Sequence, residues 1–305
     1  MNSSISLYRQ LDSIQNQPYY RYLLLDMLGD VNELSILHPS LLKEQFAKEH
    51  IIPIARPELN YDLSSCPHLI CLALPNQSIN FEYIQNSYIE AMQERLFTKR
   101  YVCSWLVSEL APTEMADAIL QNGINLGLLV NKPFIPFYEP FLLQLLQDDN
   151  HIQVGWLKKY LPFAKHYFYL DVSAKLRDAT YQQDENLSEW VFLSDSIPFN
   201  LRENKNIFYL YAEYVDILSD EGKTADDRTL SQLLGYYQKS TKRLSNLSDC
   251  YLFTIYCMRY GDLSNNSSVL AILKRYDNNE IDNFRDALIN LDENELLQNS
   301  DIGQL

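Results

Sequence analysis

SWLVSELAPTEMADAIL, residues Ser104 to Leu120, contains the pattern on which the predicted fold depends. Its first residues belong to the run Tyr101–Val107, which is rich in β-branched and aromatic residues and predicts a strand. Pro112 then stands where the first residue of a helix is expected, Glu114 lies in that helix's first turn, and Asn122-Gly123 supplies a stop. A strand followed at once by a helix is typical of an α/β architecture.

Segments on the N-terminal side of this stretch repeat the alternation. Arg21–Asp26 (RYLLLD) and His68–Leu74 (HLICLAL) predict strands, and the second is apolar on both faces, as in a covered central strand. Ile51–Ala55 contains Pro53, which favours an edge strand or an interrupted strand. Apolar residues at helical spacing predict a helix from Ser78 to Leu96.

On the C-terminal side, Leu128–Ile135 is expected to be extended, and Pro140 opens another short helix. The whole pattern predicts an α/β lobe over residues 1–180, with a mixed, largely parallel sheet flanked by helices. Beyond about Thr180 helical patterns dominate, as in Leu230–Leu244 and Leu247–Tyr260. We therefore expect a mostly α-helical, acidic lobe over residues 181–305, with the linker within Tyr181–Ser188.

The net negative charge of the chain limits the classes of partner that can be expected. The chain has 305 residues and a formal charge of −15, and its part from Asp184 onward contains 21 acidic and 11 basic residues. The negative electrostatic field of such a chain repels phosphate groups, so neither nucleic acid nor an anionic membrane is an expected partner. A basic protein would be attracted, although a solvated surface that maintains solubility is the simpler interpretation. Met1–Asn16 is polar and has no signal-peptide core, which predicts a cytoplasmic protein.

The sequence contains none of the common nucleotide-binding, hydrolase or metalloprotease motifs. Cys66, His68 and Cys71 form a compact cluster, but no second pair of ligands has the spacing of a zinc site. Buried thiols are therefore expected for the five cysteines. We expect no catalytic residue, no metal, no cofactor and no small-molecule substrate.

Four segments, taken in order, resemble the effector chaperone (adaptor) family of bacterial type VI secretion. They are YLLLD at Tyr22–Asp26, CPHLICL at Cys66–Leu72, SWLVSELAPTEMADAIL at Ser104–Leu120, and PFYEPFLLQLL at Pro136–Leu146. The last is similar to the family's arginine–aromatic–aromatic–aspartate–proline–arginine turn into a helix. The resemblance covers about residues 20–170.

Three positions of that motif differ here. Pro136 and Phe141 stand in place of its two arginines, and Glu139 stands in place of its aspartate. Glutamate is a poorer helix cap than aspartate, because its longer side chain reaches back less readily to the first-turn N–H groups. The aromatic pair and the proline that starts the helix are retained.

The resemblance implies a non-enzymatic adaptor that binds a toxic effector in the cytoplasm and assists its loading onto the secretion spike, with the spike protein as a second candidate partner. An immunity protein that inhibits a toxin is one alternative, and a hydrolase with a dispersed active site is another. Aromatic side chains are favoured at protein interfaces, although rings of this kind also fill cores. The candidate residues at the lobe junction or the partner surface are Phe137, Tyr138, Glu139, Pro140, Trp156, Trp190, Tyr209 and Tyr211.

Overall fold

The computed structural model describes residues 3–148, 157, 160–180, 196–281 and 283–297. The chain divides into two compact units, Met1–Lys205 (unit 1) and Asn206–Leu305 (unit 2). The predicted linker, Tyr181–Ser188, lies outside the described residues. Within the described part of the chain, every helix is too short or too polar to span a bilayer.

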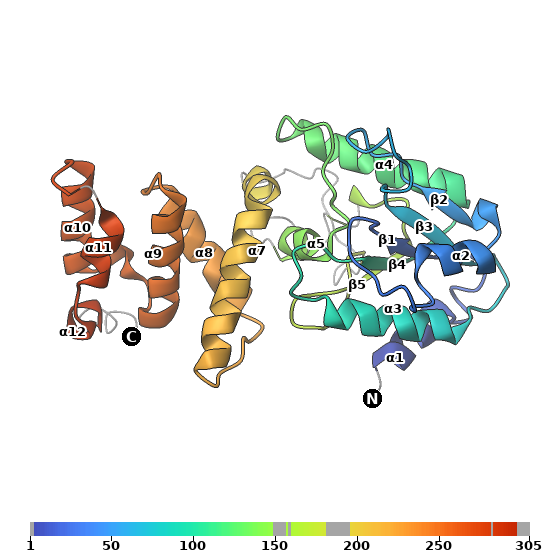
Figure 1. The fold of residues 1–305 in the computed structure, drawn as a ribbon, viewed down its shortest axis with the longest axis horizontal. Coiled ribbons are helices and arrows are strands. Elements are labelled where there is room, and N and C mark those ends of the chain that lie inside the picture. The colour runs from blue at the N-terminus through green and yellow to red at the C-terminus, as the bar shows by residue number, and fades with distance from the viewer. Residues whose placement is uncertain (1–2, 149–156, 158–159, 181–195, 282, 298–305) are drawn as a thin grey trace. The chain divides into compact units, whose positions relative to one another are not determined.

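Unit 1 contains a six-stranded sheet between layers of helices (Figure 1). The strand order is β2-β3-β1-β4-β5-β6, and every neighbouring pair is antiparallel. The strands are β1 (Tyr20–Leu25), β2 (Ile51–Pro53), β3 (His68–Ala73), β4 (Val102–Ser108), β5 (His166–Leu170) and β6 (Leu176–Asp178). The prediction of a largely parallel sheet is therefore wrong.

The position of β1 explains this error. β3 and β4 are joined through helix α3 (Phe81–Gln93), and both are antiparallel to β1, so they run in the same direction. They are not paired with each other, because β1 lies between them. This is a split β-α-β arrangement, in which strand–helix–strand alternation occurs without parallel pairing.

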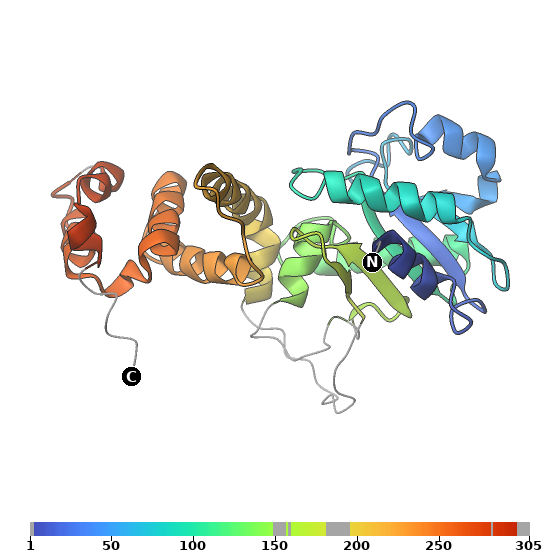
Figure 2. The same ribbon diagram turned by 90° about the horizontal axis from the view of Figure 1, so that it is seen from below.

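Both faces of the sheet are covered by helices, which explains why its central strands are apolar on both sides. Residues of α4 (Pro112–Leu128) and α5 (Pro140–Gln147) pack on one face. Residues of α1 (Ser3–Leu11), α2 (Pro39–Gln45) and α3 pack on the other. Figure 2 shows α1 and α3 on their side of the sheet.

Helix α4 is longer than predicted, because Asn122-Gly123 does not end it. A Cβ atom on Gly123 would lie 2.1 Å from the Phe134 ring, and one on Gly127 would lie 2.4 Å from the Lys132 carbonyl oxygen. The two glycines let the segment after the helix fold back against it, and Ile135 N–H donates to the Gly123 carbonyl at 2.9 Å. The extended stretch predicted from Leu128 is instead the end of α4 and the irregular segment that follows it.

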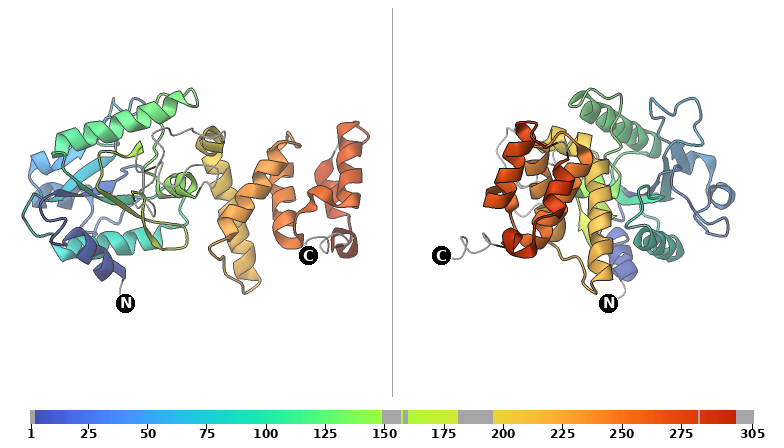
Figure 3. Two further views of the ribbon diagram at one scale, coloured as in Figure 1. Left: turned by 180° about the vertical axis from the view of Figure 1, so that it is seen from behind. Right: turned by 60° about the vertical axis from the view of Figure 1, so that its left-hand side comes forward.

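Unit 2 is helical in its described part, as expected (Figure 3). Helix α7 (Ser196–Asp220) begins in unit 1 and supplies the first residues of unit 2. It is followed by α8 (Thr229–Thr241), α9 (Leu247–Tyr260), the 3₁₀ turn η2 (Leu263–Asn265), α10 (Ser267–Asp277), α11 (Phe284–Ile289) and α12 (Glu293–Leu297). The side chains of Asn246, Asn266 and Asn283 accept hydrogen bonds from first-turn N–H groups and cap α9, α10 and α11.

Candidate functional site

The first and last of the four resembling segments meet at the end of β1. Asp26 follows this strand directly, and its side chain is fully buried. Its N–H donates to the Tyr101 carbonyl at 2.8 Å, and its Oδ1 accepts from Leu28 N–H at 3.1 Å. Gly29 completes the turn, and a Cβ atom there would lie 2.5 Å from Tyr101 N. The backbone therefore approaches too closely for any larger residue at position 29.

A group of charged and phenolic side chains surrounds Asp26. We call it the Asp26 cluster: Asp26, Arg56, Glu58, Lys99, Tyr138 and Glu139. Lys99 Nζ lies 2.6 Å from Asp26 Oδ2 and also forms an ion pair with Glu139. Lys99 thus connects the end of β1 to the turn that begins α5.

Arg56 makes the second connection across the cluster. One of its amino groups donates to the Tyr138 hydroxyl at 2.9 Å and lies 3.9 Å from Asp26 Oδ2, and the other lies 2.5 Å from Glu58 Oε1. Its guanidinium also lies 5.0 Å from the centre of the Phe134 ring. Planar donors of this kind suit several fixed partners at once.

Burial and neighbouring charges shift the pKa values of three members of this cluster, Lys99, Arg56 and Tyr138, away from neutral pH. Burial opposes the charge of Lys99, but Glu139 and Asp26 outweigh it and raise the Lys99 pKa to about 12. Burial likewise opposes the charge of Arg56, but Tyr138 and Glu58 outweigh it and raise the Arg56 pKa. Burial, with Asp26 adding to it, raises the pKa of Tyr138 well above its usual value. General acid–base catalysis works best with a pKa near the operating pH, so these three groups suit a rigid connection better than proton transfer.

The predicted junction residues are placed as follows. Phe137 and Tyr138 are fully buried, and Pro140 is the buried first residue of α5. The Glu139 side chain makes no cap hydrogen bond to α5 and instead pairs with Lys99. None of the three apolar or phenolic side chains is available to a partner at the surface, so in this structure their role is to shape the turn.

The predicted surface aromatics differ from one another. Tyr209 is 52% exposed, whereas its neighbour Tyr211 is only 2% exposed and belongs to the core. Trp156 and Trp190 lie outside the described residues. Of the aromatic candidates beyond the α5 turn, Tyr209 is therefore the one that the described structure presents to solvent.

Tyr209 belongs to a polar face of α7. Glu213, Asp216 and Asp220 follow it at steps of four, three and four residues, and all are exposed. Residues at this spacing share one side of a helix. None of the three acids forms an ion pair within the described residues. We call these four residues the α7 stripe.

The cysteines, including those of the short Cys-His-Cys cluster, lie in the protein core. All five cysteines are buried, as predicted. The His68 ring lies 2.8 Å from the Cys66 carbonyl oxygen, and burial lowers the His68 pKa and raises that of Cys71 to about 11. Nowhere in the described ranges do three or more His, Cys, Asp or Glu side chains gather so that they could hold a metal ion.

Sequence reasoning missed Lys99 and Arg56, which connect the cluster. Each lies in a polar segment without periodicity, between predicted strands or helices. The one available signal was the preference of buried acids for cationic partners, and that preference identifies no particular residue.

Comparison of the chain with protein-family models, with curated proteins and with solved structures finds no match. The resemblance to the effector chaperone family stays a prediction that rests on the four segments.

Proposed function

We propose that this protein is a cytoplasmic adaptor of bacterial type VI secretion, which holds a toxic effector and assists its loading onto the spike. The observation that supports this most directly is the convergence of the four resembling segments. β1 pairs with both β3 and β4, so three of the segments lie side by side in one sheet. Lys99 joins Asp26 of the first segment to Glu139 of the fourth.

The state of the Asp26 cluster agrees with a binding role. Its cations are paired and remain charged near neutral pH, which gives a fixed turn at the start of α5. A rigid scaffold of this kind lets a protein present a constant surface to its partner. The cluster is not required to change protonation state for such a role.

The α7 stripe is the surface that we assign to the partner. It combines a half-exposed tyrosine with three acids that have no ion-pair partner among the described residues, and the chain as a whole has a charge of −15. Tyrosine supplies contact area with little loss of side-chain freedom, and the acids attract a basic surface and orient it. The effector segment bound here is therefore expected to be basic.

Affinity capture from producing cells tests the proposal. The tagged protein should retain one large toxin at low salt and less of it at moderate salt, because exposed charges are screened. Tyr209→Ser should weaken capture, whereas Tyr61→Ser should not, since Tyr61 is an 82% exposed tyrosine of unit 1 and is not part of the stripe. Equal capture by both variants would contradict the assignment of the stripe.

The state of the captured toxin separates the adaptor from an immunity protein. An immunity protein abolishes the toxin's activity in the complex, whereas an adaptor need only hold it. Capture of no toxin from cells that express their secretion genes would refute both and favour the hydrolase alternative.

A further inference from the structure

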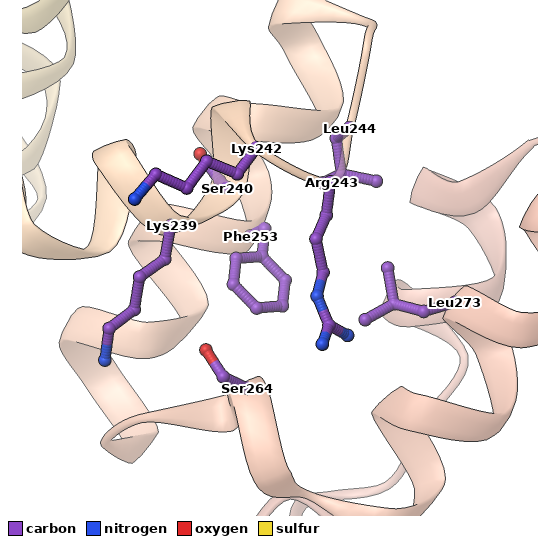
Figure 4. Close-up of a pocket in the computed structure, with 8 residues that line it drawn as sticks. All are labelled: Lys239, Ser240, Lys242, Arg243, Leu244, Phe253, Ser264 and Leu273. Carbon is purple, nitrogen blue, oxygen red and sulfur yellow. The ribbon is translucent and has the colours of Figure 1, made fainter.

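Unit 2 contains a pocket of about 220 Å³ between the end of α8 and the helices that follow it (Figure 4). It is lined by side chains from α8, from the turn after α8, and from α9, η2 and α10. They are Lys239, Ser240, Lys242, Arg243, Leu244, Phe253, Ser264 and Leu273. All of these residues belong to one compact unit.

The floor of the pocket is apolar and held in place. Leu244, Phe253 and Leu273 are each less than 5% exposed, and the Phe253 ring packs against Phe284 with 6.3 Å between centres. Ser240 is also buried, and its hydroxyl donates to the Tyr237 carbonyl at 2.8 Å. These side chains are fixed by the core of unit 2, so the pocket is formed before any ligand arrives.

The rim of the pocket is basic, although its surroundings are acidic. Residues 206–305 carry 16 acidic and 9 basic side chains, and three of those nine basic residues fall within positions 239–243. Lys239 is paired with Asp262, but the side chains of Lys242 and Arg243 form no ion pair within the described residues. Both are exposed. Two exposed cations, Lys242 and Arg243, are therefore available at the rim of the pocket.

The orientation of the Arg243 side chain indicates what kind of ligand the pocket suits. In Figure 4 its side chain runs between Phe253 and Leu273, and its guanidinium reaches the side of the pocket on which Ser264 lies. Lys239 lies in the last turn of α8, where a basic residue favourably opposes the helix dipole, whereas Lys242 and Arg243 follow that turn. The dipole does not require an arginine head group above an apolar floor. That arrangement suits a ligand with an apolar body and an anionic group.

The size of the pocket limits the ligand. Sites for drug-sized molecules and cofactors have volumes of about 300–1,000 Å³. A pocket of about 220 Å³ is smaller and suits a single side chain of a protein segment. Anchoring by one apolar side chain in a preformed pocket, with charges at its rim, is a common form of protein recognition.

We propose that this pocket binds an acidic segment of the partner protein. One apolar side chain of the segment packs on Phe253 and Leu273, and an adjacent carboxylate pairs with Arg243 and Lys242. This inference rests on the proposed function, since it names a second contact on the same partner. The α7 stripe would take a basic part of the effector and the pocket an acidic part, so the two surfaces together select for charge pattern as well as shape.

A defined peptide tests the pocket without the effector. The probe is a fluorescein-labelled peptide of alternating aspartate and leucine or phenylalanine, titrated with the full-length protein at low salt and followed by anisotropy. Arg243→Glu should weaken binding at least about tenfold, because it replaces attraction at the rim by repulsion. Lys274→Glu makes the same change of charge at an exposed lysine outside the pocket and should have little effect. Unchanged melting curves would show that both variants fold.

The outcomes separate this inference from the proposed function. Absence of peptide binding, or equal loss in Arg243→Glu and Lys274→Glu, overturns the pocket proposal even if the protein captures a toxin. Peptide binding that depends on Arg243, together with failure to capture any toxin, supports the pocket and refutes the adaptor. Loss of both peptide binding and toxin capture in Arg243→Glu alone supports the two proposals together.

Discussion

Replacement of Lys99 by methionine tests the Asp26 cluster. Lys99 is the common partner of Asp26 and Glu139, and methionine has a similar length without the charge. The rise of the Lys99 pKa from 10.5 to about 12 corresponds to roughly 2 kcal/mol of net attraction in the folded state. The Asp26 side chain is fully buried, so its loss of a partner adds a further penalty. We expect Lys99→Met to lower the free energy of unfolding of unit 1 by about 2–4 kcal/mol.

Urea unfolding followed by tryptophan fluorescence measures this change. All three tryptophans belong to unit 1, so the signal reports on that unit. Lys132→Met is the matched control, because Lys132 is exposed and forms no ion pair within the described residues. Its free energy of unfolding should change by less than about 0.5 kcal/mol.

A double variant decides whether the loss comes from the ion pair. Asp26→Asn combined with Lys99→Met should cost less than the two single changes together, by at least about 1 kcal/mol. Strict additivity would refute the view that Lys99 acts through Asp26. A loss for Lys132→Met as large as that for Lys99→Met would refute the estimate as a whole.

Three further substitutions, two in unit 1 and one in unit 2, have expected effects on stability. Burial raises the pKa of Glu94 to about 7, above its ordinary value of 4.5, although Tyr101 and Val102 N–H groups donate to its Oε2 at 2.9 and 3.1 Å. The folded protein then keeps a proton that the unfolded chain releases, so the contribution of Glu94 to stability falls between pH 4.5 and 7. Glu94→Gln should reduce this fall, measured as the difference in urea midpoint between pH 5 and pH 7.5, and an unchanged difference would contradict it. Gly123→Ala should destabilise unit 1 by about 1–3 kcal/mol, because the new methyl group meets the Phe134 ring at 2.1 Å. Gly235→Ala in α8, where nothing lies within 4 Å of the added Cβ, should instead stabilise unit 2 by about 0.5–1 kcal/mol in thermal unfolding, and the same sign for both would contradict the packing argument.

Local signals in the sequence predicted local structure well. Pro112 and Pro140 each begin a helix, Leu247–Tyr260 is a helix, and the proline-containing segment at Ile51 is an edge strand. These features depend on one residue's backbone chemistry or on a short period, which a single sequence displays. Burial of β3 on both of its faces was also predicted correctly.

Strand direction could not be predicted in the same way. A strand covered on both faces is apolar throughout whether its neighbours run parallel or antiparallel to it. β1 is inserted between β3 and β4 by long-range pairing, and no residue within either strand signals that choice. The extent of α4 depends likewise on Phe134, which returns to Gly123 from beyond the helix.

The candidate site was only partly predicted, because its connections also depend on contacts between residues that are distant in the sequence. The turn around Phe137 and Tyr138 was recognised from its motif, but its link to Asp26 depends on Lys99 and Arg56, whose surroundings arise only in the folded chain. Tyr209 and Tyr211 have similar neighbours in the sequence, yet one is exposed and the other buried, because they lie on different faces of α7. Aromatic content alone does not separate these two cases.

Export of the captured toxin is the most direct test of the adaptor function. The gene for this protein would be deleted in the producing bacterium, and the amount of that toxin and of a second, unrelated secreted toxin would be measured outside the cells. We predict that export of the first toxin is lost, that export of the second continues, and that the wild-type gene restores the first. Unchanged export of the captured toxin in the deletion strain would contradict the adaptor function.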